Sequence, residues 1–196
     1  MRIIAGSAKG KTLMSPPMTT RPTSDRAREA FFSAIESAFN LIDGWDVDSI
    51  SFLDLFSGSG AVGVEALSRG AARVVAVEQN EEAAEVTLSN SELVTHRFGS
   101  FQLNRMDVKT YLSSVRGIED GFDIIFLDPP YELSNEEITS ILELIKRNGF
   151  LSEHGLVAIE RKTKSRPFEW PAGMVLEKKR SYGEASIYYG GFVREG

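Results

Sequence analysis

The sequence predicts an α/β fold, with a mostly parallel β-sheet, helices on both faces and an antiparallel hairpin near the C-terminus. From residue 50 onward, short apolar segments alternate with amphipathic ones, which is the order of repeated strand–helix units. A glycine-rich turn separates the first apolar segment from the helix that follows it. The last two strand-like segments follow each other without a helix between them, as in a hairpin.

Hydrophobic spacing places the individual elements. An N-terminal segment rich in glycine, proline and basic residues (1–22) precedes a helix over 25–40, where apolar residues recur every three or four positions. We therefore divide the chain into a basic arm, 1–22, and a domain, 23–196. The expected strands are 51–56, 72–78, 98–106, 122–127, 155–161, 174–180 and 185–190. Of the later helices, the one after the glycine turn ends near residue 69, and the others cover 81–94, 108–115 and 135–147.

The composition is that of an ordinary globular protein, and it limits the chemistry. The 196 residues are 42% hydrophobic and 26% charged. The absence of cysteine excludes disulfides, iron–sulfur clusters and a thiol nucleophile. The chain has only two histidines, and this small number argues against a metal site. No apolar run approaches the roughly 20 residues that cross a bilayer, and the N-terminus lacks the apolar core of a secretory signal. We expect a soluble, cytoplasmic monomer without metal or membrane partner.

Basic side chains gather in two segments of a chain whose net charge is −6. Residues 1–30 hold six basic and two acidic side chains, and residues 160–180 hold seven basic and three acidic ones. If the two segments meet in space, they form a surface that can follow phosphates; if not, they are ordinary solvated side chains. The candidates for nucleic-acid contact are Arg2, Lys9, Lys11, Arg21, Arg26, Arg28, Lys162 and Lys164.

Gly58, Gly60 and Gly63 follow the first strand of the alternating region with the G-x-G-x-x-G spacing. Glycine allows a tight turn and a close approach of the backbone to a ligand at the next helix N-terminus. Glu78 ends the next predicted strand, twenty residues after Gly58, where a carboxylate can accept from both ribose hydroxyls. The pattern predicts an adenosine-containing ligand, although a turn that needs glycine only for packing has the same spacing.

Two acidic residues favour S-adenosylmethionine over a dinucleotide. Asp54 directly precedes the glycine turn, where its charge would repel a pyrophosphate but attract an ammonium and a sulfonium. Asp107 follows the third strand of the series and can accept from an adenine amino group. The spacing of the glycines alone does not separate the two cofactors.

Asp128-Pro129-Pro130-Tyr131 follows the fourth strand of the series. Ligands of such sheets bind outside the carboxyl ends of the strands, so we expect this corner and the glycine turn to share one crevice. Two prolines remove two N–H donors. The carboxylate and carbonyls that remain suit an exocyclic amine, and Tyr131 offers a face for stacking a base. The pattern predicts in-line attack of the amine on a sulfonium methyl, although a diproline that merely ends a core strand is the alternative.

The glycine turn and the proline corner resemble those of class I S-adenosylmethionine-dependent methyltransferases that modify exocyclic amines of nucleobases. Four further stretches narrow the resemblance to the bacterial 16S ribosomal RNA guanine-N2 methyltransferase family, and they extend it nearly from end to end. These stretches are residues 2–6, 9–13, 20–32 and 65–71.

The resemblance implies a Rossmann-like sheet of seven strands, S-adenosylmethionine as cofactor, no metal, and methylation of a guanine N2 in 16S rRNA of the assembled or assembling small ribosomal subunit. The N-terminal arm would help to grip the RNA. The chain departs from the family pattern at Ala185, where a threonine is expected; this difference lies in the hairpin and leaves the residues of the two turns unchanged. The implied cofactor-binding residues are Asp54, Phe56, Gly58, Gly60, Glu78, Gln79, Asp107 and Val108, and the implied catalytic residues are Asp128, Pro129, Pro130 and Tyr131.

Three alternatives stay open at the level of sequence. An adenine-N6 or protein-amide methyltransferase would share the fold and the proline corner. A dinucleotide-binding oxidoreductase, or a nucleotide sensor without catalysis, would share the glycine turn. An RNA-binding assembly factor would need the basic segments but not the corner.

Overall fold

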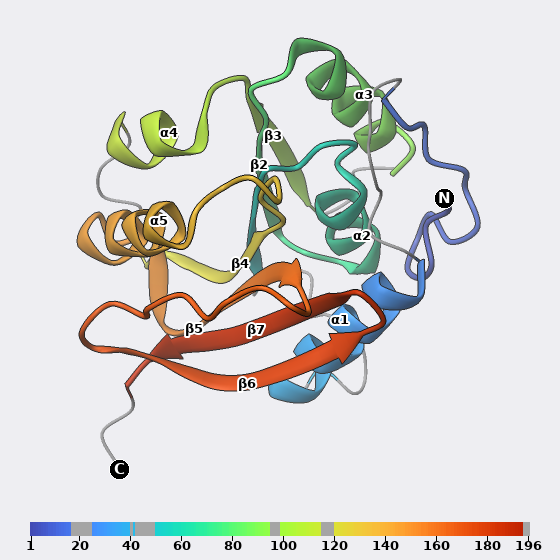
Figure 1. The fold of residues 1–196 in the computed structure, drawn as a ribbon. Coiled ribbons are helices and arrows are strands. Elements are labelled where there is room, and N and C mark those ends of the chain that lie inside the picture. Colours follow the sequence, from blue (N-terminus) through green and yellow to red (C-terminus); the bar gives the residue numbers. More distant parts are fainter. Residues whose placement is uncertain (17–24, 40, 42–49, 95–98, 115–119, 194–196) are drawn as a thin grey trace. The chain divides into compact units, whose positions relative to one another are not determined.

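The computed structural model describes residues 1–16, 25–39, 41, 50–94, 99–114 and 120–193. The chain divides into two compact units, Met1–Met106 and Asp107–Gly196. Figure 1 traces the elements of both units along the chain. Each unit is described by itself below.

The first unit contains a parallel sheet whose strand order is β3-β2-β1. The first two strands of the chain are buried along nearly their whole length, which explains their continuous apolar sequences. In chain order the elements are α1 (Asp25–Ala38), β1 (Ser51–Leu55), α2 (Ala61–Arg69), β2 (Arg73–Val77), α3 (Glu81–Ser91) and β3 (Ser100–Asn104).

Residues 1–16 pack against α2 and α3 of this unit. Arg2 and Thr12 form an antiparallel bridge, and the side chains of Ile3, Ala8 and Leu13 are almost completely buried. The Glu65 carboxylate of α2 accepts from the N–H groups of Ile4 and Ala5 at 2.8 and 2.9 Å. The segment that we expected to be a basic arm is therefore held by its backbone on the surface of the first unit.

Gly6 shows why this segment needs its particular sequence. Its φ of +79° lies in the left-handed region, and an added Cβ would lie 1.7 Å from the Ser68 carbonyl oxygen at the end of α2. Ser68 also receives a backbone hydrogen bond through its Oγ, from Ala8 N–H at 3.0 Å. Only glycine allows so close an approach.

The second unit contains four strands in the order β4-β5-β7-β6. β4 and β5 are parallel, whereas β7 is antiparallel to both β5 and β6. The hairpin of β6 and β7 is drawn in orange and red in Figure 1. In chain order the elements are α4 (Val108–Ser114), β4 (Phe122–Leu127), α5 (Asn135–Arg147), β5 (Leu151–Lys162), β6 (Met174–Tyr182) and β7 (Ala185–Phe192).

The predicted elements are found in the predicted order, and their boundaries differ at a few ends. α5 begins as expected, because Ser134 caps it and forms a reciprocal capping box with Glu137. β5 begins at Leu151, four residues before its expected start at 155. The added residues are mostly polar, so no apolar pattern predicts them. Leu151 pairs with Phe122 of β4, and after an irregularity in the register the pairing resumes at Leu156. Position 155, inside the strand, is occupied by glycine because a Cβ there would lie 2.8 Å from the Phe122 carbonyl oxygen.

Two kinds of feature are absent from the described residues. None of the helices there is long and apolar enough to cross a membrane. In the same residues, no three potential metal-ligating side chains come together.

Candidate cofactor site and methyl-acceptor corner

The residues between β1 and α2 form a tight turn in the left-handed region. Phe56, Gly58 and Gly60 have φ values of 63°, 58° and 72°. Glycine adopts this conformation freely, whereas phenylalanine adopts it at a cost that is typical of functional sites. Gly60 N–H donates to the Ser57 carbonyl at 2.7 Å, and Ser57 N–H donates to the Val77 carbonyl at 3.0 Å. The turn is thus closed on itself and anchored to the end of β2.

The three glycines of the motif have different roles. A Cβ at Gly60 would lie 2.8 Å from Cγ2 of Thr87, and one at Gly63 would lie 3.1 Å from Oδ2 of Asp54. These two glycines are needed for packing. A Cβ at Gly58 would meet nothing within 4 Å. Gly58 is therefore the position at which a ligand can approach the backbone of the turn.

Glu78 follows β2 and binds the turn directly. Its Oε2 accepts from Gly58 N–H and its Oε1 accepts from Asn80 N–H, both at 2.8 Å. A carboxylate oxygen has a second lone pair, so both oxygens can still accept a hydroxyl group. Gln79, the next residue, is exposed.

Asp54 lies beneath the turn, with 1% of its surface exposed. Its Oδ2 accepts from Gly63 N–H at 2.9 Å, in the first turn of α2. A negative charge at a helix N-terminus is stabilising. The structure therefore gives Asp54 a supporting role in the turn, and its predicted action on the cofactor stays a prediction.

Asp107 and Val108 begin the second unit, at the start of α4. Hydrogen bonds from the Thr110 hydroxyl and from Thr110 N–H, the latter 2.9 Å from Oδ1, hold the pKa of Asp107 below its ordinary value. The exposed carboxylate is thus ionised at neutral pH and can accept a further hydrogen bond. Val108, in contrast, is buried.

The Asp128–Tyr131 corner follows β4 in the second unit. Pro129 is buried and Pro130 is exposed. The Pro130 carbonyl accepts from Leu133 N–H at 3.0 Å and from Arg161 at 3.5 Å. We expected both prolyl carbonyls to be available to an amine. The Pro130 carbonyl therefore already has partners, and the roles of the Asp128 carboxylate and the Pro129 carbonyl as acceptors stay predictions.

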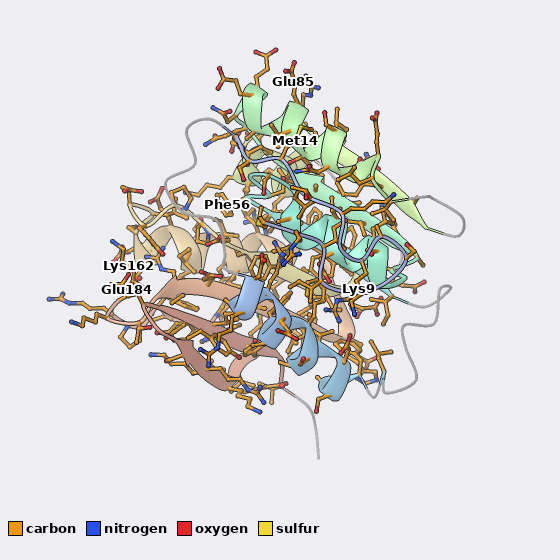
Figure 2. The ribbon with its side chains drawn as sticks, turned by 90° about the vertical axis from the view of Figure 1, so that its right-hand side faces the viewer. Lys9, Met14, Phe56, Glu85, Lys162 and Glu184 are labelled. Carbon is orange, nitrogen blue, oxygen red and sulfur yellow. The ribbon has the colours of Figure 1, made fainter. Side chains whose placement is uncertain are left out.

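Tyr131 has an ammonium group over its ring. Nζ of Lys162 lies 4.3 Å from the ring centroid. Lys162 is exposed, and Figure 2 shows it beside Glu184, whose carbonyl accepts from Thr163 N–H at 2.8 Å. A base that stacks on this face of Tyr131 must displace Lys162.

Most of the basic residues predicted to bind RNA are exposed. Lys11 also donates from Nζ to the Leu93 carbonyl at 2.6 Å, so it helps to hold the N-terminal segment on the first unit. Arg21 lies outside the described residues. The exposed candidates are Arg2, Lys9, Lys11, Arg26, Lys162 and Lys164.

Arg28 requires a correction, because its side chain is fully buried and not available to RNA. Its Nη2 donates to the Arg2 carbonyl and to Oδ1 of Asp25. Burial lowers the pKa of Arg28, and the charges of Glu65 and Asp25 oppose this shift. The sequence held a signal: position 28 precedes Phe32 by four residues, so Arg28 lies on the apolar face of α1.

Sequence reasoning missed two polar side chains of α3 that support the glycine turn. Thr87 Oγ1 donates to the Gly58 carbonyl at 2.9 Å, and Asn90 Nδ2 donates to the Ser59 carbonyl at 2.8 Å. Both are completely buried, three positions apart on one face of the helix. A polar residue on the buried face of an amphipathic helix was the available signal.

The strand directions, the glycine turn after β1 and the corner after β4 are those of a class I methyltransferase fold. A solved structure described as "Putative methyltransferase yhhF from Escherichia coli" agrees, with a TM-score of 0.75, 28% identity, and coverage of 97% of this chain and 96% of that one. The chain belongs to the family described as conserved hypothetical protein 95, whose model matches residues 1–190.

Two curated proteins are similar over nearly the whole chain. "Putative rRNA methyltransferase YlbH" of Bacillus subtilis (strain 168) is 35% identical over 191 residues, 95% of this chain and 96% of that protein. "Ribosomal RNA small subunit methyltransferase D" of Escherichia coli (strain K12) is 30% identical over 187 residues, 95% of this chain and 87% of that protein. The predicted fold, family and S-adenosylmethionine-dependent class are therefore confirmed.

Proposed function

We propose that this chain transfers a methyl group from S-adenosylmethionine to the N2 amine of a guanine in 16S rRNA, with the assembled or assembling small ribosomal subunit as substrate. The observation that carries the proposal is the corner after β4, whose two prolines supply no hydrogen-bond donor. Such a corner matches an amine, which donates, and not a phosphate or a ring carbonyl. The name of the similar Escherichia coli protein supports the small-subunit rRNA as substrate.

The residues of the glycine turn fit an adenosine-containing cofactor. No Cβ at Gly58 limits the approach of a ligand, while its N–H and carbonyl are held by Glu78 and Thr87. The Glu78 oxygens can accept from ribose hydroxyls in addition to their present donors. Asp107, which is ionised, would accept from the adenine amine. When bound, S-adenosylmethionine supplies an electrophilic methyl group on a sulfonium. We assign the remaining cofactor contacts to Asp54, Phe56, Gly60, Gln79 and Val108.

The chemistry at the acceptor is chiefly a matter of orientation. An aryl amine is a poor nucleophile because its lone pair is delocalised into the ring. Hydrogen bonds from the amine to the Asp128 carboxylate and to the Pro129 carbonyl would favour a tetrahedral nitrogen and aim its lone pair at the methyl carbon. The proton can leave after transfer, so no strong base is required. The guanine must lie outside a stacked helix to be reached, in a loop or as a flipped nucleotide.

Methyl transfer from labelled S-adenosylmethionine to small subunits that lack the modification tests the proposal, with the modified nucleoside identified by mass spectrometry. N2-methylguanosine is the expected product. N6-methyladenosine or a methylated protein amide would instead support the alternatives of the same fold. If naked 16S rRNA were methylated as fast as the small subunit, the proposal that the subunit is the substrate would fail.

An Asp128→Ala variant tests the acceptor site separately. It should bind S-adenosylhomocysteine like the unaltered protein in calorimetry and lose methyl transfer by about 10²-fold or more, because the amine loses the acceptor that orients it. Undiminished turnover would reject the role of Asp128. Calorimetry with NAD in parallel tests the oxidoreductase alternative, for which NAD would bind in place of S-adenosylhomocysteine.

A further inference from the structure

The Asp128–Tyr131 corner is short of hydrogen-bond donors of its own. Pro129 and Pro130 have no N–H group with which to tie the chain to a neighbouring strand. The turn is closed by one backbone bond, from Leu133 N–H to the Pro130 carbonyl at 3.0 Å. A segment that must place an amine accurately therefore needs donors from elsewhere.

Arg161 of β5 supplies such donors. In the parallel register Leu127, the last residue of β4, lies opposite Ile159, so Arg161 is on the same face of the sheet as Ile159. Its Nη2 donates to the Leu133 carbonyl at 2.8 Å, and its Nη1 lies 3.5 Å from the Pro130 carbonyl. One planar guanidinium thus contacts the carbonyls at both ends of the turn.

The burial of Arg161 is unfavourable for the stability of the fold. The residue is 5% exposed, its Nε has no hydrogen-bond partner, and burial lowers its pKa. Among the described residues, no carboxylate forms an ion pair with it. A buried charge without a counter-charge destabilises the folded state. The benefit of this arginine therefore lies in what it holds in place.

Lys162, the next residue, contacts the same corner from solvent. Its Nζ lies over the Tyr131 ring, 4.3 Å from the centroid, in a cation–π contact. Two consecutive residues at the end of β5 thus hold the main chain and the aromatic ring of one turn. The exposed Lys162 can move away when a base enters, whereas the buried Arg161 has no such freedom.

We propose that Arg161 is a positioning residue for the methyl-acceptor corner. It fixes the backbone that carries the Asp128 carboxylate and the Pro129 carbonyl, and so sets the position of the target amine. The identity of that amine rests on the proposed function, but the contacts of Arg161 do not. Loss of the guanidinium would leave the base bound but poorly aligned, so the rate of transfer should fall more than the affinity for substrate.

The test compares Arg161→Met and Arg161→Lys with a matched control, Arg147→Met, which removes an exposed arginine at the end of α5. On small subunits that lack the modification, Arg161→Met should lower kcat by about 10–100-fold. The KM values for the donor and for the subunit should stay nearly unchanged. Arg161→Lys keeps the charge but not the planar fork and should recover part of the rate. Arg147→Met should match the unaltered protein.

Two kinetic results would overturn the proposal. One is an unchanged kcat in Arg161→Met. The other is a loss confined to the KM for the subunit with a weaker salt dependence, which would mean that Arg161 binds a phosphate.

A protein-only readout separates this proposal from the proposed function. If the unaltered protein transfers no methyl group to guanine N2, the proposed function fails, and Arg161 is judged by nuclear magnetic resonance of the free protein. The amide resonance of Leu133 and the ring resonances of Tyr131 should shift in Arg161→Met and not in Arg147→Met. If they do not shift, Arg161 does not hold the corner, whatever the substrate.

Discussion

Replacing Asn90 with leucine should weaken both the first unit and its affinity for the cofactor. Asn90 is completely buried in α3. Its Oδ1 accepts from Met14 N–H at 2.8 Å, and its Nδ2 donates to the Met14 and Ser59 carbonyls at 3.0 and 2.8 Å. One amide therefore connects the N-terminal segment to the glycine turn. Leucine has a similar volume but makes none of these three bonds.

The size of the effect follows from the number of lost bonds. Each hydrogen bond contributes roughly 0.5–1.5 kcal/mol net, so Asn90→Leu should lower the free energy of unfolding by about 3 kcal/mol. At about 2–4 °C per kcal/mol for a chain of this length, the melting temperature should fall by roughly 6–12 °C. The Ser59 carbonyl also loses the partner that fixes its orientation, so we expect weaker binding of S-adenosylhomocysteine.

Urea unfolding and calorimetry with S-adenosylhomocysteine measure the two effects. Asn148→Leu is the matched control, because Asn148 gives one hydrogen bond, from Nδ2 to the Leu112 carbonyl, and lies in the other unit. It should cost about 1 kcal/mol and leave the affinity unchanged. An Asn90→Leu protein as stable as the unaltered one would refute the reasoning. An unchanged affinity would limit the role of Asn90 to folding.

Two further predictions concern Gly6 and Asp107. Gly6→Ala should destabilise the protein far more than Gly10→Ala in urea unfolding. Both glycines have positive φ, but a Cβ at Gly6 would lie 1.7 Å from the Ser68 carbonyl oxygen, whereas a Cβ at Gly10 would meet nothing within 4 Å. Equal losses would show that residues 1–16 are not packed on α2. For Asp107, the lowered pKa means that its ionised form stabilises the fold above the unfolded-state pKa of about 3.9, and that this contribution is lost as pH falls through the folded-state value. The stability advantage over Asp107→Asn should thus be full at neutral pH and disappear in acid, and a gap independent of pH would contradict this.

The sequence predicts most of the fold because the strands that form the core are strongly apolar. β4, for example, begins and ends at the residues we expected, since five of its six residues are buried and a diproline follows it. The start of β5 was missed because residues 152–154 are polar, and the strand begins at Leu151, which pairs with Phe122 of β4 before an irregularity in the register. Pairing of this kind leaves no periodic pattern in the sequence.

Sequence motifs predicted the residues that would contact a ligand, but they did not predict the side chains that hold the two turns in place. The glycine spacing and the proline corner identified the two turns, but the contacts of Asn90 and Arg161 depend on segments 76 and 31 residues away along the chain. Arg28 was assigned to RNA from its charge, although its place on the apolar face of α1 buries it. Charge alone does not separate an arginine that binds a partner from one that binds its own backbone.

The two turns are supported by side chains of opposite charge, and the reason lies in their backbones. The glycine turn presents N–H groups, and carboxylates accept from them: Glu78 from Gly58 and Asp54 from Gly63. The proline corner presents carbonyls and no N–H of its own at two positions, so a cation, Arg161, donates to it. In the function we propose, each supporting charge would also suit the ligand, because the carboxylates would attract a cationic methyl donor and the corner would offer acceptors to an amine. A substitution that reverses either charge should therefore disturb the turn and its ligand together, which ties the stability of each turn to the chemistry it serves.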